Sequence, residues 1–318
     1  MKDPIQPVSG TVVPRYAGAS TFVRLPELRD LDRCDVAILG VPFDAGVSYR
    51  PGARFGPHAV RQASRMLRPQ FHPVHAIEPF ALIQGADAGD VPCTPFDIRA
   101  ALEAIERGAD EVLERAGSIV SIGGDHTVVL PILRTTRRRH GPVALVHFDA
   151  HLDTWDTYFG APYTHGTLLR RAAEEGLFRD DASMHVGIRG PLYGARDMAE
   201  DAAFGFRTVR TEDVHREGVD GVVARIRQRV GDDPLYVSID IDCLDPAHAP
   251  GTGTPEVGGL TTRELLMIVR GLAGLRLVSA DVVEVSPPYD HADLTSLAAA
   301  TVVYELVCLL AAGRNERA

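Results

Sequence analysis

Six side chains in three separate segments have the types and spacing needed to bind metal ions together. They are His126, Asp149, His151, Asp153, Asp240 and Asp242. Alternate side chains of an extended segment project to one side, so residues 149–153 present three potential ligands and residues 240–242 present two. His126 follows a flexible pair of glycines at positions 123 and 124, so it could approach from a third direction.

The four carboxylates of this set predict divalent cations. Packed in a protein interior without cations, they would repel one another and shift one another's titration. Two divalent ions formally balance the four charges and would acidify a water molecule held between them. Carboxylates with some imidazole favour Mn²⁺, although ligand type alone also admits Fe, Co, Ni or Zn. A lone Asp-X-Asp pattern is usually a solvated strand end, but three convergent motifs favour a binuclear site.

Short apolar runs without polar alternation lie close before these motifs and elsewhere in the chain. They span residues 36–39, 119–122, 143–146, 235–239 and 277–283. Such runs are typical of strands covered on both faces, so we expect a three-layer αβα fold with a central parallel sheet. Ligand sites in open α/β sheets form at the carboxyl ends of the strands, where the three motifs could meet.

A helical pattern between two of these strands supports the alternation of strands and helices. It begins at Ile98, with Asp97 as a plausible N-cap, and continues to Ala116 with one apolar face. Gly117 is the expected C-terminal stop. The pattern therefore predicts a strand–helix–strand unit.

The motifs resemble the signatures of the ureohydrolase family, which includes arginases, agmatinases and guanidino-acid hydrolases. The matching segments are G-G-D-H (123–126), D-A-H-L-D (149–153), S-I-D-I-D-C-L-D-P (238–246), A-P-G-T-G-T-P (249–255) and V-E-V-S-P-P-Y-D (283–290). The resemblance extends from about Val36 to Leu310. It implies the family's arginase-like αβα fold, a small guanidino substrate and assembly as a homotrimer or homohexamer.

The resemblance also implies a ligand set for each of two Mn²⁺ ions per chain. The first set is His126, Asp149, Asp153 and Asp240, and the second is Asp149, His151, Asp240 and Asp242. Asp149 and Asp240 would bridge the two ions. Every ligand position of the family is filled, which argues against a non-catalytic homologue acting as a binding module. The single-zinc deacetylases that share this architecture would need fewer carboxylates.

Two further residues take catalytic roles by resemblance. Glu284 falls at the position of the family's guanidinium-binding glutamate, and a carboxylate can hold a planar, cationic guanidinium through paired hydrogen bonds. His165 matches the family's proton-shuttling histidine. An imidazole suits the delivery of a proton to the departing amine.

The identity of the substrate depends on the loop between Asp153 and His165, which departs from the arginase pattern. Trp155, Asp156 and Tyr158 could receive the ammonium end of agmatine, which is the first-choice substrate. Arg189 could instead receive the carboxylate of 4-guanidinobutyrate or 3-guanidinopropionate, which are the alternatives. The loop at 50–57 also resembles the family, but its Gly and Pro residues suggest turn chemistry and we assign it no catalytic role.

Composition limits the other classes of function. The net charge of −10 disfavours nucleic acid or an anionic membrane as partner and is compatible with a cationic small molecule. No apolar run approaches the roughly 20 residues that a membrane span needs. Four widely separated cysteines, including Cys243 beside the acidic motif, suggest reduced bystander thiols and a cytoplasmic protein. The remaining histidines should be exposed or hydrogen bonded. We expect one domain over residues 1–318, with an N-terminal extension of about residues 1–34.

Overall fold

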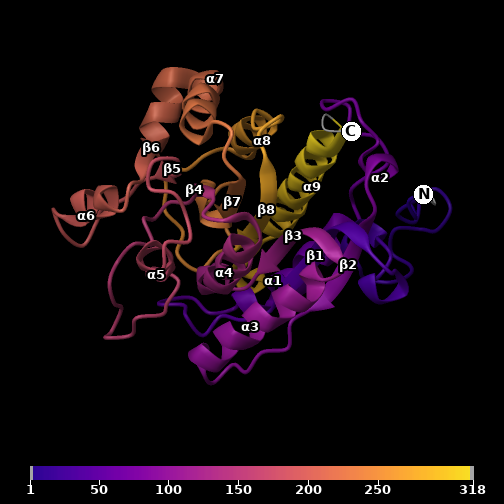
Figure 1. The fold of residues 1–318 in the computed structure, drawn as a ribbon, viewed down its shortest axis with the longest axis horizontal. Helices are drawn as coiled ribbons and strands as arrows, with labels where there is room; N and C mark the ends of the chain where they lie inside the picture. The colour runs from indigo at the N-terminus through magenta and orange to yellow at the C-terminus, as the bar shows by residue number, and fades with distance from the viewer. Residues whose placement is uncertain (1–2, 316–318) are drawn as a thin grey trace.

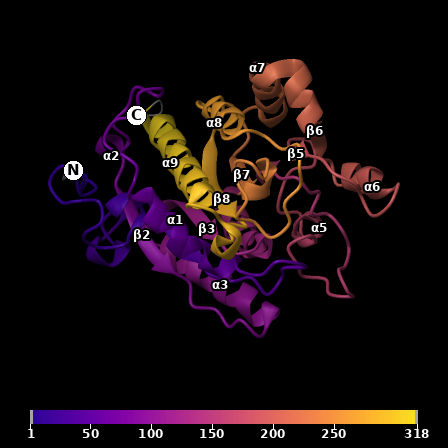
Figure 2. The same cartoon turned by 180° about the vertical axis from the view of Figure 1, so that it is seen from behind.

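The computed structural model describes residues 3–315 and forms an eight-stranded parallel sheet. The strand order is β2-β1-β3-β8-β7-β4-β5-β6. The strands are β1 (Cys34–Val41), β2 (Gly85–Asp90), β3 (Ala116–Gly123), β4 (Ala144–Phe148), β5 (Met184–Ile188), β6 (Arg207–Arg210), β7 (Leu235–Asp240) and β8 (Leu277–Val283). Helices lie on both sides of the sheet (Figures 1 and 2), so the predicted three-layer αβα fold is confirmed.

The helices alternate with the strands along much of the chain. The α-helices are α1 (Gly56–Ser64), α2 (Pro79–Leu82), α3 (Ile98–Leu113), α4 (Val129–His140), α5 (Leu168–Glu174), α6 (Asp197–Ala203), α7 (Thr211–Val230), α8 (Thr262–Arg270) and α9 (Leu294–Asn315). The short 3₁₀ turns are η1 (Phe22–Arg24), η2 (Leu28–Asp30), η3 (Ala53–Phe55), η4 (His126–Val128), η5 (Ile241–Cys243) and η6 (Pro287–Tyr289).

The five apolar runs all form strands, and the expected helix is α3. Asp97 caps α3 by accepting hydrogen bonds from the backbone N–H groups of Arg99 and Ala100, at 3.0 and 3.1 Å. The prediction that Gly117 stops this helix is wrong, because α3 ends at Leu113 and Gly117 lies in β3. A side chain at Gly117 would come within 2.7 Å of the carbonyl oxygen of Asp35 on the neighbouring strand, so close packing explains the glycine.

The five apolar runs left out β5 as well as β2 and β6, which are the two edge strands of the sheet. Their sequences, G-A-D-A-G-D and R-T-V-R, contain few large apolar residues. An edge strand has one neighbour in the sheet and needs less burial on its faces, which explains the weaker signal.

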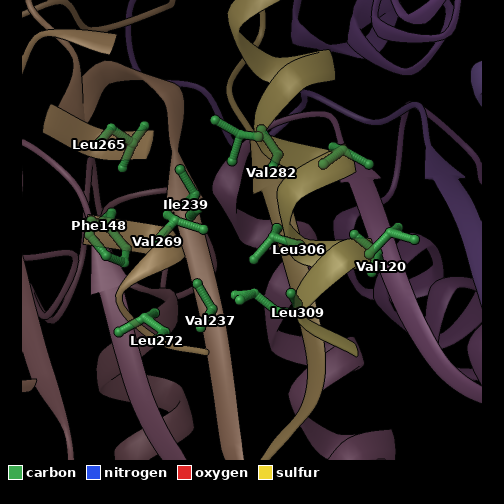
Figure 3. Packing of buried hydrophobic residues seen from close by; sticks show 14 of the residues in the cluster. Val120, Phe148, Val237, Ile239, Leu265, Val269, Leu272, Val282, Leu306 and Leu309 are labelled. Atoms are coloured by element: carbon green, nitrogen blue, oxygen red, sulfur yellow. The ribbon is translucent and has the colours of Figure 1, made fainter. Parts of the chain in front are cut away.

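Apolar side chains fill the space between the sheet and the helices on each face. On one face, Val237, Ile239 and Val282 of the sheet pack with Leu265 of α8 and Leu306 of α9 (Figure 3). On the other face, residues of α3, α4 and α5 cover the sheet. Full burial of such a side chain contributes about 1.5–3 kcal/mol, so these two layers hold the strand ends in fixed positions.

Helix α9 corrects one expectation from the sequence. An 18-residue window within Leu294–Arg314 has a mean hydropathy of 1.9, so this helix is long and apolar enough, by length and composition, to cross a membrane. In the structure, however, 72% of this window is buried. The helix packs against the sheet beside α1 and α8, so a core helix accounts for its apolar composition.

The order of the strands explains how the motifs meet. Strands β3, β8, β7 and β4 are consecutive neighbours in the middle of the sheet. Because all four run parallel, the residues that follow them lie at one edge of the sheet. His126, Glu284, Asp240 and Asp149 each lie at or just after the end of one of these strands.

Candidate active site

His126 faces three carboxylates at the centre of the site. Its Nδ1 atom lies 3.2 Å from Asp149 Oδ2, 3.1 Å from Asp153 Oδ2 and 3.3 Å from Asp240 Oδ2. The imidazole is fully buried, and its Nδ1 atom has no hydrogen-bond partner among residues 3–315. A buried nitrogen surrounded by carboxylate oxygens has the arrangement of a metal ligand.

A second imidazole completes the cluster on the other side of Asp149. His151 Nδ1 lies 3.2 Å from Asp149 Oδ1 and 3.1 Å from Asp242 Oδ2. The two oxygens of Asp149 therefore face two different imidazoles, as a carboxylate shared by two ions requires. All six residues predicted from the sequence come together here.

The local backbone orients the carboxylates in a common way. Asp149 Oδ1 accepts a hydrogen bond from His151 N at 2.6 Å, and Asp240 Oδ1 accepts one from Asp242 N at 2.8 Å. Asp242 Oδ1 accepts one from Ala150 N at 3.1 Å. In each case the second oxygen points into the cluster, because a backbone N–H group holds the first.

The electrostatics of the cluster fit bound cations. Burial and the charges of Asp242 and Asp149 raise the pKa of Asp240 well above its usual range. Burial and the charge of Asp149 raise the pKa of Asp153 to about 6. These carboxylates lack enough positive charge around them, and Asp149 Oδ2 has no hydrogen-bond partner among residues 3–315. Two divalent ions would supply the missing charge and coordination.

Sequence reasoning missed His147. Its Nε2 atom lies 3.0 Å from Asp149 Oδ2, and its Nδ1 atom lies 2.8 Å from His185 Nδ1. Burial lowers the pKa of His147 to about 3. A signal was present, because residues 147, 149 and 151 alternate along one extended segment. His185 was expected to be a satisfied histidine, and its bonds to His147 and Asp201 make it one.

Glu284 lies fully buried beside the cluster. Its Oε1 atom accepts hydrogen bonds from His126 N at 2.9 Å and from His165 Nδ1 at 3.0 Å. Its Oε2 atom has no partner among residues 3–315. Glu284 also has a left-handed backbone, with φ of 63°, a conformation that non-glycine residues adopt mostly at special sites. A buried carboxylate oxygen without a donor is a candidate to bind a cationic group.

His165 has a partner for each of its protonation states. Burial lowers its pKa, but the hydrogen bond and charge of Glu284 outweigh burial and raise it to about 9. When Nε2 is unprotonated, it can accept from the backbone N–H of Ser48, at 3.1 Å. When Nε2 is protonated, it can donate to the Ser48 hydroxyl, at 2.7 Å. A residue that passes protons needs both arrangements.

A cavity of about 440 Å³ opens from the ligand cluster. His151, Asp153, Asp240 and His165 lie in its wall together with a set of aromatic residues. The aromatic residues are Tyr49, Trp155, Tyr158, Phe159 and Tyr193. The sequence nominated Trp155 and Tyr158 from this set, and the structure places both beside the cluster.

Two other nominated residues lie elsewhere. Asp156 is exposed and pairs with Arg171 at 2.7 Å, so the structure does not support its predicted contact with an ammonium group. Arg189 is buried, and its guanidinium group donates to backbone carbonyls of residues 187, 242–244, 256 and 257. Its donors are thus occupied by backbone carbonyls, which stabilises the surrounding loops. The expectation that Arg189 receives a substrate carboxylate therefore needs correction.

The cavity has charged residues that sequence reasoning did not nominate. Arg50, from the loop to which we assigned no catalytic role, and Glu256 both line it. Within residues 3–315, neither side chain forms an ion pair, although the Arg50 guanidinium lies 5.8 and 5.3 Å from the ring centroids of Tyr49 and Tyr289. A charged side chain without an ionic partner beside a cavity is a candidate to contact a charged ligand. Neither position could be recognised from its own sequence, because each meets the cavity only through folding.

The parallel sheet and the His/Asp cluster at its carboxyl edge are the framework of a metal-dependent hydrolase. Residues 34–308 match the Arginase family, and the chain belongs to this family. The ureohydrolase resemblance of the sequence is thereby confirmed.

Individual relatives agree with this assignment over nearly the whole chain. A guanidinopropionase of Pseudomonas aeruginosa is 48% identical, and a guanidinobutyrase of the same organism is 44% identical, each over 96% of both chains. The solved structure of the proclavaminate amidino hydrolase from Streptomyces clavuligerus superposes with a TM-score of 0.89 at 41% identity. That match covers 94% of this chain and 99% of the solved one.

Proposed function

We propose that the protein hydrolyses a guanidino acid, of the size of 3-guanidinopropionate or 4-guanidinobutyrate, to urea and an ω-amino acid. The observation that carries the proposal is Arg50 in the wall of the cavity beside the ligand cluster, because a carboxylate tail needs a cationic partner away from water. The guanidinopropionase and guanidinobutyrase relatives support the same substrate class.

The six clustered residues would hold two Mn²⁺ ions, which supply Lewis acidity that activates a water molecule. Glu284 would bind the guanidinium through Oε2 and orient its carbon. The water oxygen would then bond to this carbon while the water gives up its O–H protons, and the bond from carbon to the substituted nitrogen would break. His165 delivers the proton that the departing amine takes up.

Agmatine, the first choice from the sequence, is the second candidate. Its support from Asp156 is lost, since that carboxylate pairs with Arg171. Glu256 could still receive its ammonium end. The rings of Trp155, Tyr158 and Tyr193, with centroids 5.5–5.8 Å apart, could also contact a cation.

The two substrates make opposite demands on the cavity, so matched variants separate them. We expect kcat/KM of the wild type to be higher for the two guanidino acids than for agmatine, with arginine poor. Arg50→Met should lower kcat/KM for guanidino acids by roughly 100-fold and leave agmatine nearly unchanged. Glu256→Gln is the matched control and should spare the guanidino acids. A wild-type preference for agmatine that Glu256→Gln removes would refute the guanidino-acid proposal.

Assembly and location complete the proposal. We propose that the chain forms a homotrimer or homohexamer in the cytoplasm and acts there on a free small molecule, with no nucleic acid or membrane as partner. The single-domain organisation, with residues up to about 34 as an extension, also stays a prediction. Sedimentation analysis of the purified protein tests the assembly directly.

A further inference from the structure

Helix α6 lies beyond β6 at the edge of the molecule (Figures 1 and 2), yet it bonds to residues next to the ligand cluster. Asp201 Oδ1 accepts a hydrogen bond from the hydroxyl of Thr154 at 2.9 Å. Asp197 Oδ2 accepts one from the indole N–H of Trp155 at 3.0 Å. The two carboxylates are four residues apart, about one helical turn, and so lie on the same face of α6.

Asp153, an expected metal ligand, immediately precedes Thr154 and Trp155, the two residues that α6 holds. Its backbone has φ of 56°, in the left-handed region. A non-glycine residue keeps this conformation when surrounding contacts hold it there. On one side, Leu169 N donates to the Asp153 carbonyl at 3.0 Å. On the other side, the hydrogen bond to Asp201 fixes Thr154, the residue that follows Asp153. This bond therefore restrains Asp153, whose carboxylate lies 3.1 Å from His126.

Asp201 also reaches the cluster by a second route. Its Oδ1 atom lies 3.0 Å from His185 Nε2, and His185 Nδ1 lies 2.8 Å from His147 Nδ1. His147 Nε2 in turn lies 3.0 Å from Asp149 Oδ2. Asp201, His185, His147 and Asp149 are all almost completely buried. The bonds from Asp201 through His185 therefore hold His147 beside the expected ligand Asp149, although His147 Nε2 and Asp149 Oδ2 form no hydrogen bond with each other. Polar groups that surround metal ligands contribute to metal affinity.

We propose that α6 is a positioning helix, in which Asp201 orients the metal ligand Asp153 and places His147 beside Asp149, while Asp197 holds Trp155 in the cavity wall. Neither carboxylate lines the cavity, so each acts through another residue. The proposal rests on the binuclear centre of the proposed function. It is independent of which guanidino compound is cleaved.

The Mn²⁺ affinity of the apoprotein tests the positioning role of Asp201. The protein is stripped with a chelator, and Mn²⁺ binding is measured by calorimetry for the wild type and for variants of Thr154. Thr154→Val removes the hydroxyl at nearly constant volume and should raise the Kd of at least one Mn²⁺ roughly 10-fold. Thr154→Ser keeps the hydroxyl and should restore wild-type affinity.

Thr136→Val is the matched control for the change in chemistry. Thr136 is also buried, and its hydroxyl donates to a carbonyl within α4, at 2.8 Å from Ile132 O. This variant should keep the wild-type Kd. Asp201→Ala removes the acceptor of both routes, and we expect a loss of Mn²⁺ affinity of 10-fold to about 100-fold. If Asp201→Ala does not fold, the Thr154 pair decides.

Steady-state kinetics test whether Asp197 positions Trp155 in the cavity wall. Trp155→Phe keeps an aromatic ring but removes the N–H group that Asp197 holds, and Asp197→Ala removes the acceptor. Both variants should raise KM roughly 5-fold, with little change in kcat or Mn²⁺ affinity.

The outcomes distinguish this proposal from the proposed function. A wild type that binds no Mn²⁺ would refute the binuclear centre itself. A wild type that binds two ions, with Thr154→Val and a folded Asp201→Ala binding equally well, would refute the positioning role. Equal weakening in Thr136→Val would show an effect of general stability and would refute it too. Unchanged KM in Trp155→Phe and Asp197→Ala would refute the role of Asp197 in positioning Trp155.

Discussion

At the scale of single residues, the carboxylates of the cluster divide the use of their two oxygens. A backbone N–H holds one oxygen of Asp149, Asp240 and Asp242, and the other oxygen faces an imidazole. For Asp240 and Asp242 this division leaves one oxygen for a cation, whereas Asp149 Oδ1 accepts from His151 N and also faces the His151 ring. Asp149 is central, because its two oxygens face His126 and His151.

Replacing Asp149 should therefore remove metal and activity together. We expect Asp149→Asn to lower Mn²⁺ content and to reduce kcat/KM by at least about 100-fold, because a shared negative charge is lost. Cys243→Ala is the control. Burial raises the pKa of this neighbouring thiol well above its usual range, and its sulfur is not part of the clustered ligand atoms. Metal analysis and urea assays measure both effects, and normal metal content in Asp149→Asn would contradict the bridge.

Glu284 and His165 should separate substrate binding from proton transfer. Glu284→Gln keeps the shape but loses the charge, so we expect kcat/KM to fall roughly 100-fold. His165→Ala should keep both metal ions and slow kcat by about 100-fold or more, the usual contribution of a general acid. Metal counts with steady-state kinetics decide the matter. Loss of metal from His165→Ala would identify a ligand instead of a proton carrier.

At the scale of elements, α9 links the sheet to the loop that precedes α2. Glu305 of α9 accepts from His72 at 2.9 Å and from His75 at 3.0 Å, and it also pairs with Arg270 of α8. Burial raises the pKa of Glu305, but these three partners outweigh burial and lower it to about 2. Two histidines that were expected to be hydrogen bonded thus belong to one hydrogen-bonded network around the buried carboxylate of Glu305.

This network predicts a pH-dependent contribution to stability. The pKa of Glu305 is lower in the folded protein than its ordinary value of 4.5, so its contribution is present above that pH and is lost as the pH falls toward 2. Glu305→Gln should lower the free energy of unfolding by about 3 kcal/mol at pH 7, and the difference should shrink between pH 5 and pH 3. Urea unfolding measures it.

An exposed acid of α3 provides the control for this change. Glu103→Gln should leave stability within about 0.5 kcal/mol of the wild type at every pH. A deficit in Glu305→Gln that stays constant from pH 7 to pH 3 would mean that the charge of Glu305 has no part in it.

At the scale of the whole molecule, a single sheet joins the two halves of the chain at the site. β3 comes from the N-terminal half, β7 and β8 come from the C-terminal half, and β4 lies between them in sequence. Metal ions bound at these strand ends connect all four strands. Metal occupancy should therefore affect the stability of the entire fold.

Chelation should lower the thermal midpoint as well as abolish urea release. A ligand that binds only the folded state stabilises it by about 2.7 kcal/mol at 100 times its Kd, so the expected shift is several degrees. Scanning calorimetry with chelator, and again after adding Mn²⁺, measures the shift. If the active protein holds one tightly bound zinc ion and Mn²⁺ restores nothing, the binuclear manganese assignment is wrong.

The sequence by itself determined the central strands and the six clustered residues. Both carry local signals: buried strands are continuous apolar runs, and ligands at alternate positions share one side of an extended segment. The edge strands carry weak signals because each has only one neighbouring strand and needs fewer buried apolar residues.

Only the tertiary structure decided which charged residues reach the cavity. Asp156 turns toward Arg171 on α5, Arg189 is held by carbonyls from two distant segments, and Arg50 enters the wall from a loop near the N-terminus. A charged side chain lies where a nearby partner can compensate its charge. Packing between elements far apart in sequence determines which partner is nearby. For the same reason, the support that α6 gives to Thr154 and Trp155 has no signature in the sequence around either residue.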